Sequence, residues 1–131
     1  MTITKTLLRK DRPNILMNYF GSLFLTVELT TFSLADYFID EYHGGSWSFF
    51  SLSNGGFYMA FKHEGNVTFN NQNNLFCESI DPEIASIIIN LYAISAVVSE
   101  SRDKNLQKRY QQLYQYAMEL PEAKLIYRAL D

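Results

Sequence analysis

The sequence predicts a single α+β domain, residues 1–131, in which a small antiparallel meander of three to four strands packs against four to five helices. Three observations support this fold class. The 131 residues fit one domain, and 47% of them are hydrophobic, which is enough to build a core. Turn-forming residues separate short apolar runs in the middle of the chain. Longer runs with helical spacing lie on both sides of that region.

The first part of the chain is basic and then apolar. Residues 1–12 carry four basic side chains and one acidic side chain, and they are a candidate flexible basic arm. The pattern in residues 14–29 does not decide between helix and strand. In residues 30–42, apolar side chains recur at helical spacing and end before a Gly-Gly pair, where a helix can terminate. We therefore expect a helix in that stretch.

Four short runs with strand character follow, at residues 47–52, 57–62, 67–70 and 75–78. Their spacers contain Asn-Gly-Gly, His-Glu-Gly-Asn and an asparagine-rich run. These residue types form tight turns because they tolerate positive φ angles. The alternation of strand-like runs and turns predicts the antiparallel meander.

Three helices are predicted after the strands. Asp81 can cap the free amides of the first one, Pro82 suits its first position, and Glu83 favours the positive end of its dipole. The body of this helix is apolar nearly all round, so we place it at the centre of the fold. Residues 102–118 have one apolar stripe and predict an outer helix, and Pro121 starts a final helix.

The hairpin predicted at residues 47–61 carries aromatic rings on both faces. If Asn54-Gly55 forms a two-residue turn, Phe50 pairs with Met59. We expect the face that carries this pair to pack against the central helix.

The opposite face of the hairpin carries Trp47, Phe49 and Tyr58 and has two interpretations. In the first, the N-terminal segment folds over Phe49 and Trp47, since monomers rarely leave large apolar patches bare. In the second, the rings belong to a partner-binding surface, because aromatic anchors are enriched where partners dock. The residues alone leave both interpretations open.

Charge is distributed unevenly along the chain. Residues 13–101 carry nine acidic side chains and one basic side chain, Lys62. A groove for phosphate backbones needs clustered Lys and Arg, so strong nucleic-acid binding is not expected. The aromatic hairpin and the basic residues 1–12 nevertheless make a nucleic-acid-binding module the alternative function. The acids are too sparse to imitate DNA, which carries a negative charge about every 1.7 Å of its axis.

No motif for catalysis or metal binding stands out. His43 and His63 lack the spacing of metal ligands, and the single cysteine, Cys77, has no cysteine partner. A hydrolase or metalloenzyme that uses these three residues is therefore a weak hypothesis, and we expect no enzyme activity, metal or cofactor. The pattern of a secretion signal and a long apolar run are both missing, so we expect a cytoplasmic protein without a membrane partner.

The stretch GGSWSFFSLSNGGFYMA, residues 44–60, resembles the signature of the ArdB/KlcA antirestriction family. Weaker similarity in the helices extends the resemblance to about residues 42–131. It implies a small cytoplasmic protein, encoded by mobile elements, that relieves type I restriction of incoming DNA through protein binding and not DNA mimicry. The implied partner is a type I restriction enzyme complex or a host factor that controls it.

The resemblance also implies a set of candidate partner-binding residues. They are Trp47, Phe49, Asn54, Gly55, Gly56, Phe57, Tyr58 and Asp131. For each of them, preservation of a turn or of the core explains the signature at least as well as contact with a partner. The sequence indicates no particular oligomeric state.

Overall fold

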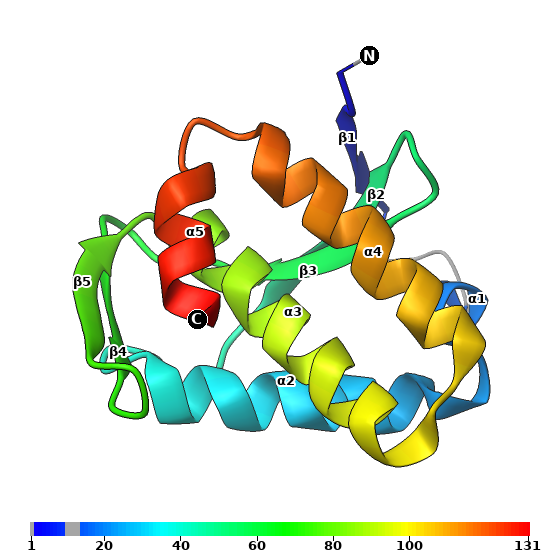
Figure 1. The fold of residues 1–131 in the computed structure, drawn as a ribbon, viewed down its shortest axis with the longest axis horizontal. Coiled ribbons are helices and arrows are strands. Elements are labelled where there is room, and N and C mark those ends of the chain that lie inside the picture. Colours follow the sequence, from blue (N-terminus) through cyan, green and yellow to red (C-terminus); the bar gives the residue numbers. More distant parts are fainter. Residues whose placement is uncertain (1, 10–13) are drawn as a thin grey trace.

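A three-stranded sheet and a separate two-stranded ribbon lie among the helices in the computed structural model, which describes residues 2–9 and 14–131 (Figure 1). The strands are β1 (Lys5–Leu8), β2 (Trp47–Leu52), β3 (Phe57–Phe61), β4 (Val67–Asn71) and β5 (Phe76–Ile80). The helices are α1 (Ile15–Phe20), α2 (Phe24–Phe38), α3 (Pro82–Ser101), α4 (Lys104–Glu119) and α5 (Ala123–Leu130), and a short 3₁₀ helix, η1 (Gly21–Leu23), joins α1 to α2. This arrangement confirms the predicted α+β class.

The predicted meander is divided between two antiparallel sheets, with β1, β2 and β3 in one and β4 and β5 in the other. The chain that follows α2 runs beside β4, where Ile39 forms a bridge with Phe69 and the Asp40 N–H donates to the Thr68 carbonyl. The Glu41 carboxylate accepts bonds from the Thr68 N–H and hydroxyl, and the bond from this N–H is the main reason that the pKa of Glu41 is lowered. These contacts hold β4 next to the end of α2 and away from β3.

The N-terminal part of the chain differs from the sequence-based expectations in two ways. Residues 5–8 of the candidate arm form β1, which pairs with β2, while residues 1 and 10–12 of that arm lie outside the described residues. The undecided stretch, residues 14–29, is helical. Gly21 has a φ of +65° at the end of α1, and this conformation lets the chain turn into η1 and α2.

The predicted helix at residues 30–42 begins and ends earlier in the structure, since α2 spans Phe24–Phe38. It stops at Ile39, whose backbone is extended with φ −107° and ψ 113°. The extended conformation is the one that Ile39 needs for its bridge to Phe69. A tertiary contact therefore sets the end of this helix, ahead of the Gly-Gly pair.

The central position predicted for α3 is confirmed, because α3 contacts α2, α4 and β3 (Figure 1). Its isoleucines are almost fully buried, and burial of such a side chain contributes about 1.5–3 kcal/mol. Asp81 precedes the helix as predicted, but its side chain makes no capping hydrogen bond. Its backbone carbonyl instead accepts the bond from the Ala85 N–H.

Polar side chains of α3 occupy the edge of β3 that faces away from β2. Asn90 Oδ1 accepts a hydrogen bond from the Met59 N–H over 3.1 Å, and Asn90 Nδ2 donates to the Met59 carbonyl over 2.7 Å. The Phe61 N–H donates to Ser86 Oγ over 3.2 Å. Both α3 side chains are buried. They take the place of a neighbouring strand and satisfy backbone groups that would otherwise be costly to bury.

Two helical stretches, Ile15–Phe38 and Pro82–Ser101, are long and apolar enough to cross a membrane by length and composition. In the second, 61% of the most apolar window is buried inside the protein, as expected for a core helix. The first is 22% buried and is interrupted by η1. The core helix of a soluble protein passes the same test of length and composition.

Candidate functional site

The turn of the β2–β3 hairpin has three residues, Ser53, Asn54 and Gly55, where the sequence predicted two. The Leu52 N–H donates to the Gly56 carbonyl over 2.9 Å, and the Gly55 N–H donates to the Leu52 carbonyl over 2.9 Å. Gly55 has a φ of +95°, the left-handed conformation that this loop type requires at its last residue.

The extra loop residue changes the register of the hairpin by one position. Phe49 pairs with Met59, and Phe50 pairs with Tyr58. The predicted pairing of Phe50 with Met59 is therefore wrong. Because side chains alternate between faces along a strand, a one-residue change exchanges the faces of one strand relative to the other. Trp47 and Phe49 thus share a face with Met59, and Tyr58 lies on the opposite face.

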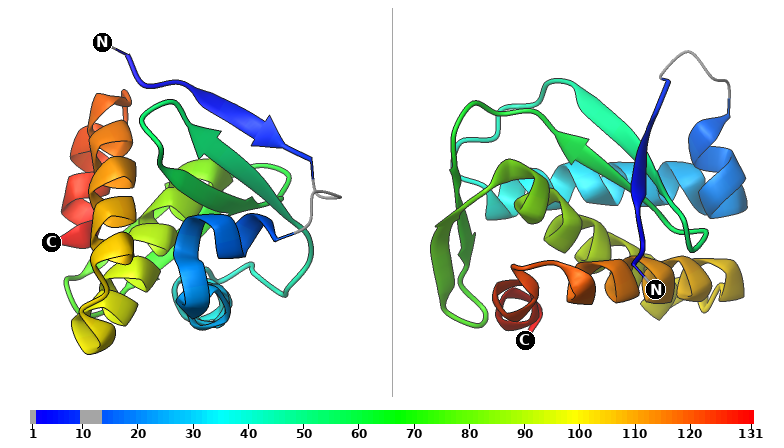
Figure 2. Two further views of the ribbon diagram at one scale, coloured as in Figure 1. Left: turned by 90° about the vertical axis from the view of Figure 1, so that its right-hand side faces the viewer. Right: turned by 90° about the horizontal axis from the view of Figure 1, so that it is seen from above.

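The N-terminal helices α1 and α2 cover the face that carries Trp47, while α4 lies on the other side of the sheet (Figure 2). The ring of Phe32 in α2 lies 5.4 Å from that of Trp47, and the ring of Tyr19 in α1 stacks on Phe57 at 4.5 Å between centroids. Trp47 is 6% exposed and Phe57 is fully buried. The first interpretation, in which the N-terminal segment folds over Trp47 and Phe49, is confirmed for Trp47, whereas Phe49 stays half-buried beside α1 and α2.

The Asn-Gly-Gly turn of the signature is bound to α4. Asn54 Nδ2 donates to the Gln112 carbonyl over 2.9 Å, and Gln112 Nε2 donates to the Asn54 carbonyl over 3.0 Å. The Arg109 guanidinium donates to the Gly55 carbonyl over 2.6 Å. A Cβ atom on Gly56 would lie 3.0 Å from Cβ of Gln112. The two glycines therefore allow the close approach of the hairpin to the helix.

The sequence analysis missed Arg109 and Gln112. Both belong to the polar side of α4, more than fifty residues after the turn, and no local pattern connects them to the hairpin. Arg109 also donates to the Tyr19 carbonyl over 2.8 Å and lies over the Tyr19 ring. It thus joins the hairpin turn, α1 and α4.

Substitution of Gly55 by alanine is expected to lower the free energy of unfolding by about 2 kcal/mol. Alanine at a φ of +95° would be strained. Its Cβ would also lie 2.7 Å from Gln112 Nε2, which would have to break its hydrogen bond to the Asn54 carbonyl. Gly44→Ala is the matched control, because Gly44 has a φ of +87° and a Cβ added there would have no atom within 4 Å. Urea unfolding should show a loss of about 1 kcal/mol for that control. Equal losses would mean that Gln112 does not restrict the turn.

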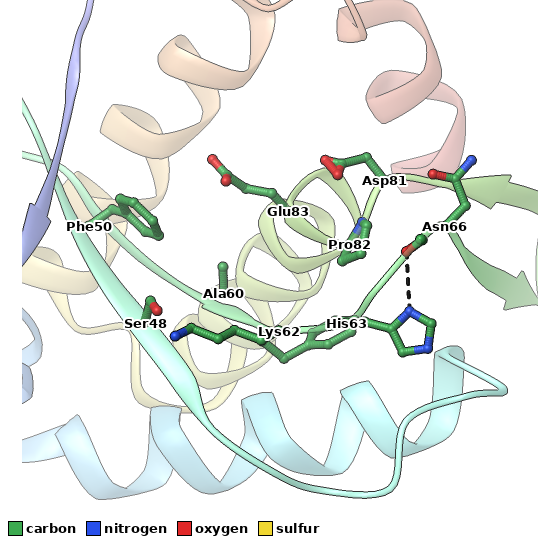
Figure 3. A pocket seen from close by; sticks show the side chains of 11 residues that line it. Ser48, Phe50, Ala60, Lys62, His63, Asn66, Asp81, Pro82 and Glu83 are labelled. Carbon is green, nitrogen blue, oxygen red and sulfur yellow. Dashed lines mark hydrogen bonds between the residues drawn. The ribbon is translucent and has the colours of Figure 1, made fainter.

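The face of the hairpin opposite α1 and α2 borders a pocket of about 420 Å³ (Figure 3). The sheet, the loop after β3 and the start of α3 surround it. The close-up shows that the side chains come from three directions and that acidic and basic groups both line the pocket. The main side chains are those of Phe50, Ala60, Lys62, His63, Asp81 and Glu83.

Glu83 links β1, β3 and α3 at this pocket. Its carboxylate accepts a hydrogen bond from the Tyr58 hydroxyl over 2.6 Å and forms an ion pair with Lys5. The Lys5 ammonium also lies 5.1 Å from the centroid of the Phe50 ring. Burial raises the pKa of Tyr58 far above its ordinary value, and the Glu83 carboxylate adds to this effect. Tyr58 therefore remains a neutral hydrogen-bond donor at physiological pH.

The stability of the protein is expected to fall as the pH rises above about 10, the ordinary pKa of tyrosine. Burial raises the pKa values of Tyr58, Tyr92 and Tyr110 in the folded protein. Above that pH the unfolded chain loses phenolic protons that the folded chain retains, so unfolding becomes more favourable. Urea unfolding between neutral and strongly alkaline pH should show this decline, and Tyr58→Phe should decline less steeply. Identical pH dependence in the two proteins would contradict the prediction.

Four of the eight predicted partner-binding residues are buried inside the protein. The side chains of Trp47, Phe57 and Tyr58 are buried and are not available to a partner or for stacking on bases. These three rings therefore do not support the alternative of a nucleic-acid-binding module, which also rested on the basic residues 1–12. Gly56 is also buried, and Asn54 is hydrogen-bonded to α4. For these residues, the explanation that the signature preserves a turn and a core fits the structure.

The other predicted residues are accessible to different degrees. Gly55 is exposed at the hairpin turn. Phe49 is half-buried and lines a pocket of about 310 Å³ together with residues of α1 and α2. Asp131 is exposed beyond the end of α5 and lines neither pocket beside the hairpin. The structure therefore does not bring the eight residues together at one surface.

The residues considered for metal binding or nucleophilic chemistry are also dispersed. His63 lies at the rim of the 420 Å³ pocket, with Nδ1 3.2 Å from the Gly65 carbonyl oxygen. Cys77 is exposed on β5. Within residues 2–9 and 14–131, no group of three or more His, Cys, Asp or Glu side chains is arranged to hold a metal ion.

Comparison with known proteins gives consistent matches. A model of an antirestriction protein family matches residues 40–131. The antirestriction protein KlcA of Escherichia coli is 37% identical over 128 residues, which cover 92% of this chain and 88% of KlcA. The uncharacterized protein YafX of Escherichia coli strain K12 is 35% identical over 118 residues, which cover 86% of this chain and 77% of YafX.

A solved structure matches over the whole chain, including the N-terminal helices. The structure of the KlcA and ArdB proteins matches with a TM-score of 0.90 and 31% sequence identity, and the match covers 100% of this chain and 96% of the other. Those proteins show a novel fold and antirestriction activity against type I DNA restriction systems in vivo but not in vitro. The shared fold therefore includes the hairpin and the helices on both sides of it.

Proposed function

Because this chain belongs to the ArdB/KlcA family of antirestriction proteins, we propose that it relieves type I restriction of incoming DNA. The observation that carries the proposal is the match of the whole chain to proteins with that activity in vivo. The family is not a known enzyme family. We therefore propose an action through binding, without catalysis or a cofactor, in the cytoplasm.

Inhibition through binding to a protein fits this chain better than inhibition through DNA mimicry. A DNA mimic needs a dense row of free carboxylates. Several carboxylates of this chain are instead used in internal bonds that connect elements of the fold. They include Glu41 with Thr68, Glu78 with Arg128, Glu83 with Tyr58 and Lys5, and Glu119 with the Ile3 N–H.

The partner in this proposal is the type I restriction enzyme complex or a host factor that controls it. The related KlcA and ArdB proteins act in vivo but not in vitro, and this difference is expected when a component of the cell is required. A host factor would account for that difference directly. A restriction complex would account for it if the inhibited state of the complex forms only in cells.

We propose that the partner contacts this protein at the 420 Å³ pocket beside the hairpin. It lies on the accessible face of the signature hairpin, and it combines the ring of Phe50 with charged side chains at its rim. Lys62 is exposed there, as is Asp81. An apolar centre with a charged rim is the usual composition of a protein-binding surface.

A plating experiment tests the function. Unmodified phage should form more plaques on a type I restricting host that expresses this protein than on the same host without it. Phage grown on a modifying host, and a host without the restriction system, serve as controls and should show no difference. Unchanged plaque numbers across several type I systems would contradict the proposal.

A further inference from the structure

A separate pocket of about 180 Å³ lies between α4 and α5. Tyr110 and Tyr114 of α4 form one part of its lining, and Tyr127, Leu130 and Asp131 form the other. None of these residues lines the 420 Å³ pocket beside the hairpin. The combination of three phenol rings and one carboxylate is different from the mixed charges of that pocket.

Three tyrosine rings lie around this small space. Tyr110 and Tyr114 are one helical turn apart and stack with 6.1 Å between centroids and 14° between planes. Tyr127 is 56% exposed, although a ring of this size is usually more buried. The face of an aromatic ring carries partial negative charge and attracts cations that lie within about 6 Å of its centroid.

Lys124 and Arg128 line a neighbouring pocket that also includes Tyr127, whereas the lining of the 180 Å³ pocket is negatively charged. Asp131 is the one charged side chain among the five lining residues. Its negative charge contributes to the raised pKa of Tyr92, after the larger effect of burial. The nearby Arg128 is engaged elsewhere, because it pairs with Glu78 and lies over the ring of Phe76. The pocket therefore has no cation of its own among its lining residues.

The size of the pocket restricts what it can bind. A volume of about 180 Å³ is below the range of roughly 300–1,000 Å³ that is typical of sites for free small molecules. It suits one extended side chain of a larger molecule. Among cationic side chains, arginine is found over aromatic rings more often than lysine, and its planar guanidinium can stack on a ring while it pairs with a carboxylate.

We propose that the pocket formed by Tyr110, Tyr114, Tyr127 and Asp131 binds an arginine side chain presented by a protein partner. The guanidinium would stack on the accessible phenol ring of Tyr127 and pair with the carboxylate of Asp131. The inference deepens the proposed function, because it gives one chemical feature of the partner. The binding itself can be measured without any restriction system.

The test uses the full chain and a blocked amino acid, Nα-acetyl-arginine N-methylamide, with the neutral citrulline analogue as the comparison. The aromatic NMR signals of Tyr110, Tyr114 and Tyr127 should shift during titration with the arginine compound, with a dissociation constant of about 1–10 mM. The citrulline compound should bind more weakly, because it has a similar shape but no charge. Equal binding of the two compounds, or no binding at about 50 mM, would overturn the proposal.

Variants show whether the binding occurs in this pocket. Tyr127→Leu and Asp131→Asn should each weaken the affinity for the arginine compound by about two- to fivefold. Tyr37→Leu is the matched control, because Tyr37 is 58% exposed but lies on α2, and it should bind as the wild type does. Unchanged affinity in Tyr127→Leu would overturn the proposal. Failure of the plating experiment would count against the antirestriction function and would leave this titration valid.

Discussion

Replacing Asn90 by leucine is expected to lower the free energy of unfolding by about 2–5 kcal/mol, because two buried backbone groups lose their partners. The Asn90 amide accepts from the Met59 N–H and donates to the Met59 carbonyl, and Asn90 is 2% exposed. Leucine is similar in size but can form neither bond. Each unsatisfied group costs about 1–3 kcal/mol when water cannot reach it.

The measurement is urea unfolding followed by circular dichroism, with Ser99→Leu as the control. Ser99 is exposed on the same helix, so this substitution should change the stability by less than about 0.5 kcal/mol. A loss below about 1 kcal/mol in Asn90→Leu would show that water or a rearranged α3 satisfies the edge of β3. That result would remove the argument that the α3 side chains replace a neighbouring strand.

Reversing the charge of Lys62 is expected to reduce phage protection by about tenfold or more, which corresponds to about 1.4 kcal/mol of binding free energy. Lys62 is exposed at the rim of the 420 Å³ pocket, which also contains Asp81 and Glu83. In Lys62→Glu the rim would carry three acidic side chains. A partner that is complementary to the present mixture of charges would then meet a like charge at close range.

The plating experiment on a type I restricting host measures this effect, and Lys108→Glu is the control. Lys108 is exposed on α4 and lines neither the 420 Å³ pocket nor the pocket between α4 and α5, and its reversal changes the net charge by the same amount. The two variants should give equal amounts of soluble protein and the same urea unfolding curves. Full protection by Lys62→Glu would contradict the proposed contact surface, and an equal loss in both variants would indicate an effect of net charge.

Local patterns in the sequence were sufficient to predict several elements of the fold. The apolar residues around every side of α3 placed it at the centre, and its start at Pro82 was predicted correctly. The four strand-like runs all became strands, and β2 has its predicted bounds. The family resemblance of the hairpin was also confirmed. These features depend on periodicity, turn residues and burial, which neighbouring residues express directly.

Features that depend on distant contacts were missed. The stretch at residues 14–29 has a helical structure that its composition left undecided, and β1 forms because β2 offers it an edge. The hairpin register differed by one residue, because a loop of two or three residues can contain the same Asn-Gly pair. That small difference reversed which aromatic rings share a face.

The candidate sites also combine features that the sequence predicted with features that only the folded structure shows. The sequence alone was enough to establish the hairpin signature, the family and the lack of a recognisable catalytic motif. Only the folded chain brings Arg109 and Gln112 to the Asn-Gly-Gly turn, Glu83 to Tyr58, and the tyrosines of α4 to Asp131. The physical reason is that hydrogen bonds and pockets join residues that are distant along the chain, whereas periodicity and turn chemistry report only on neighbours.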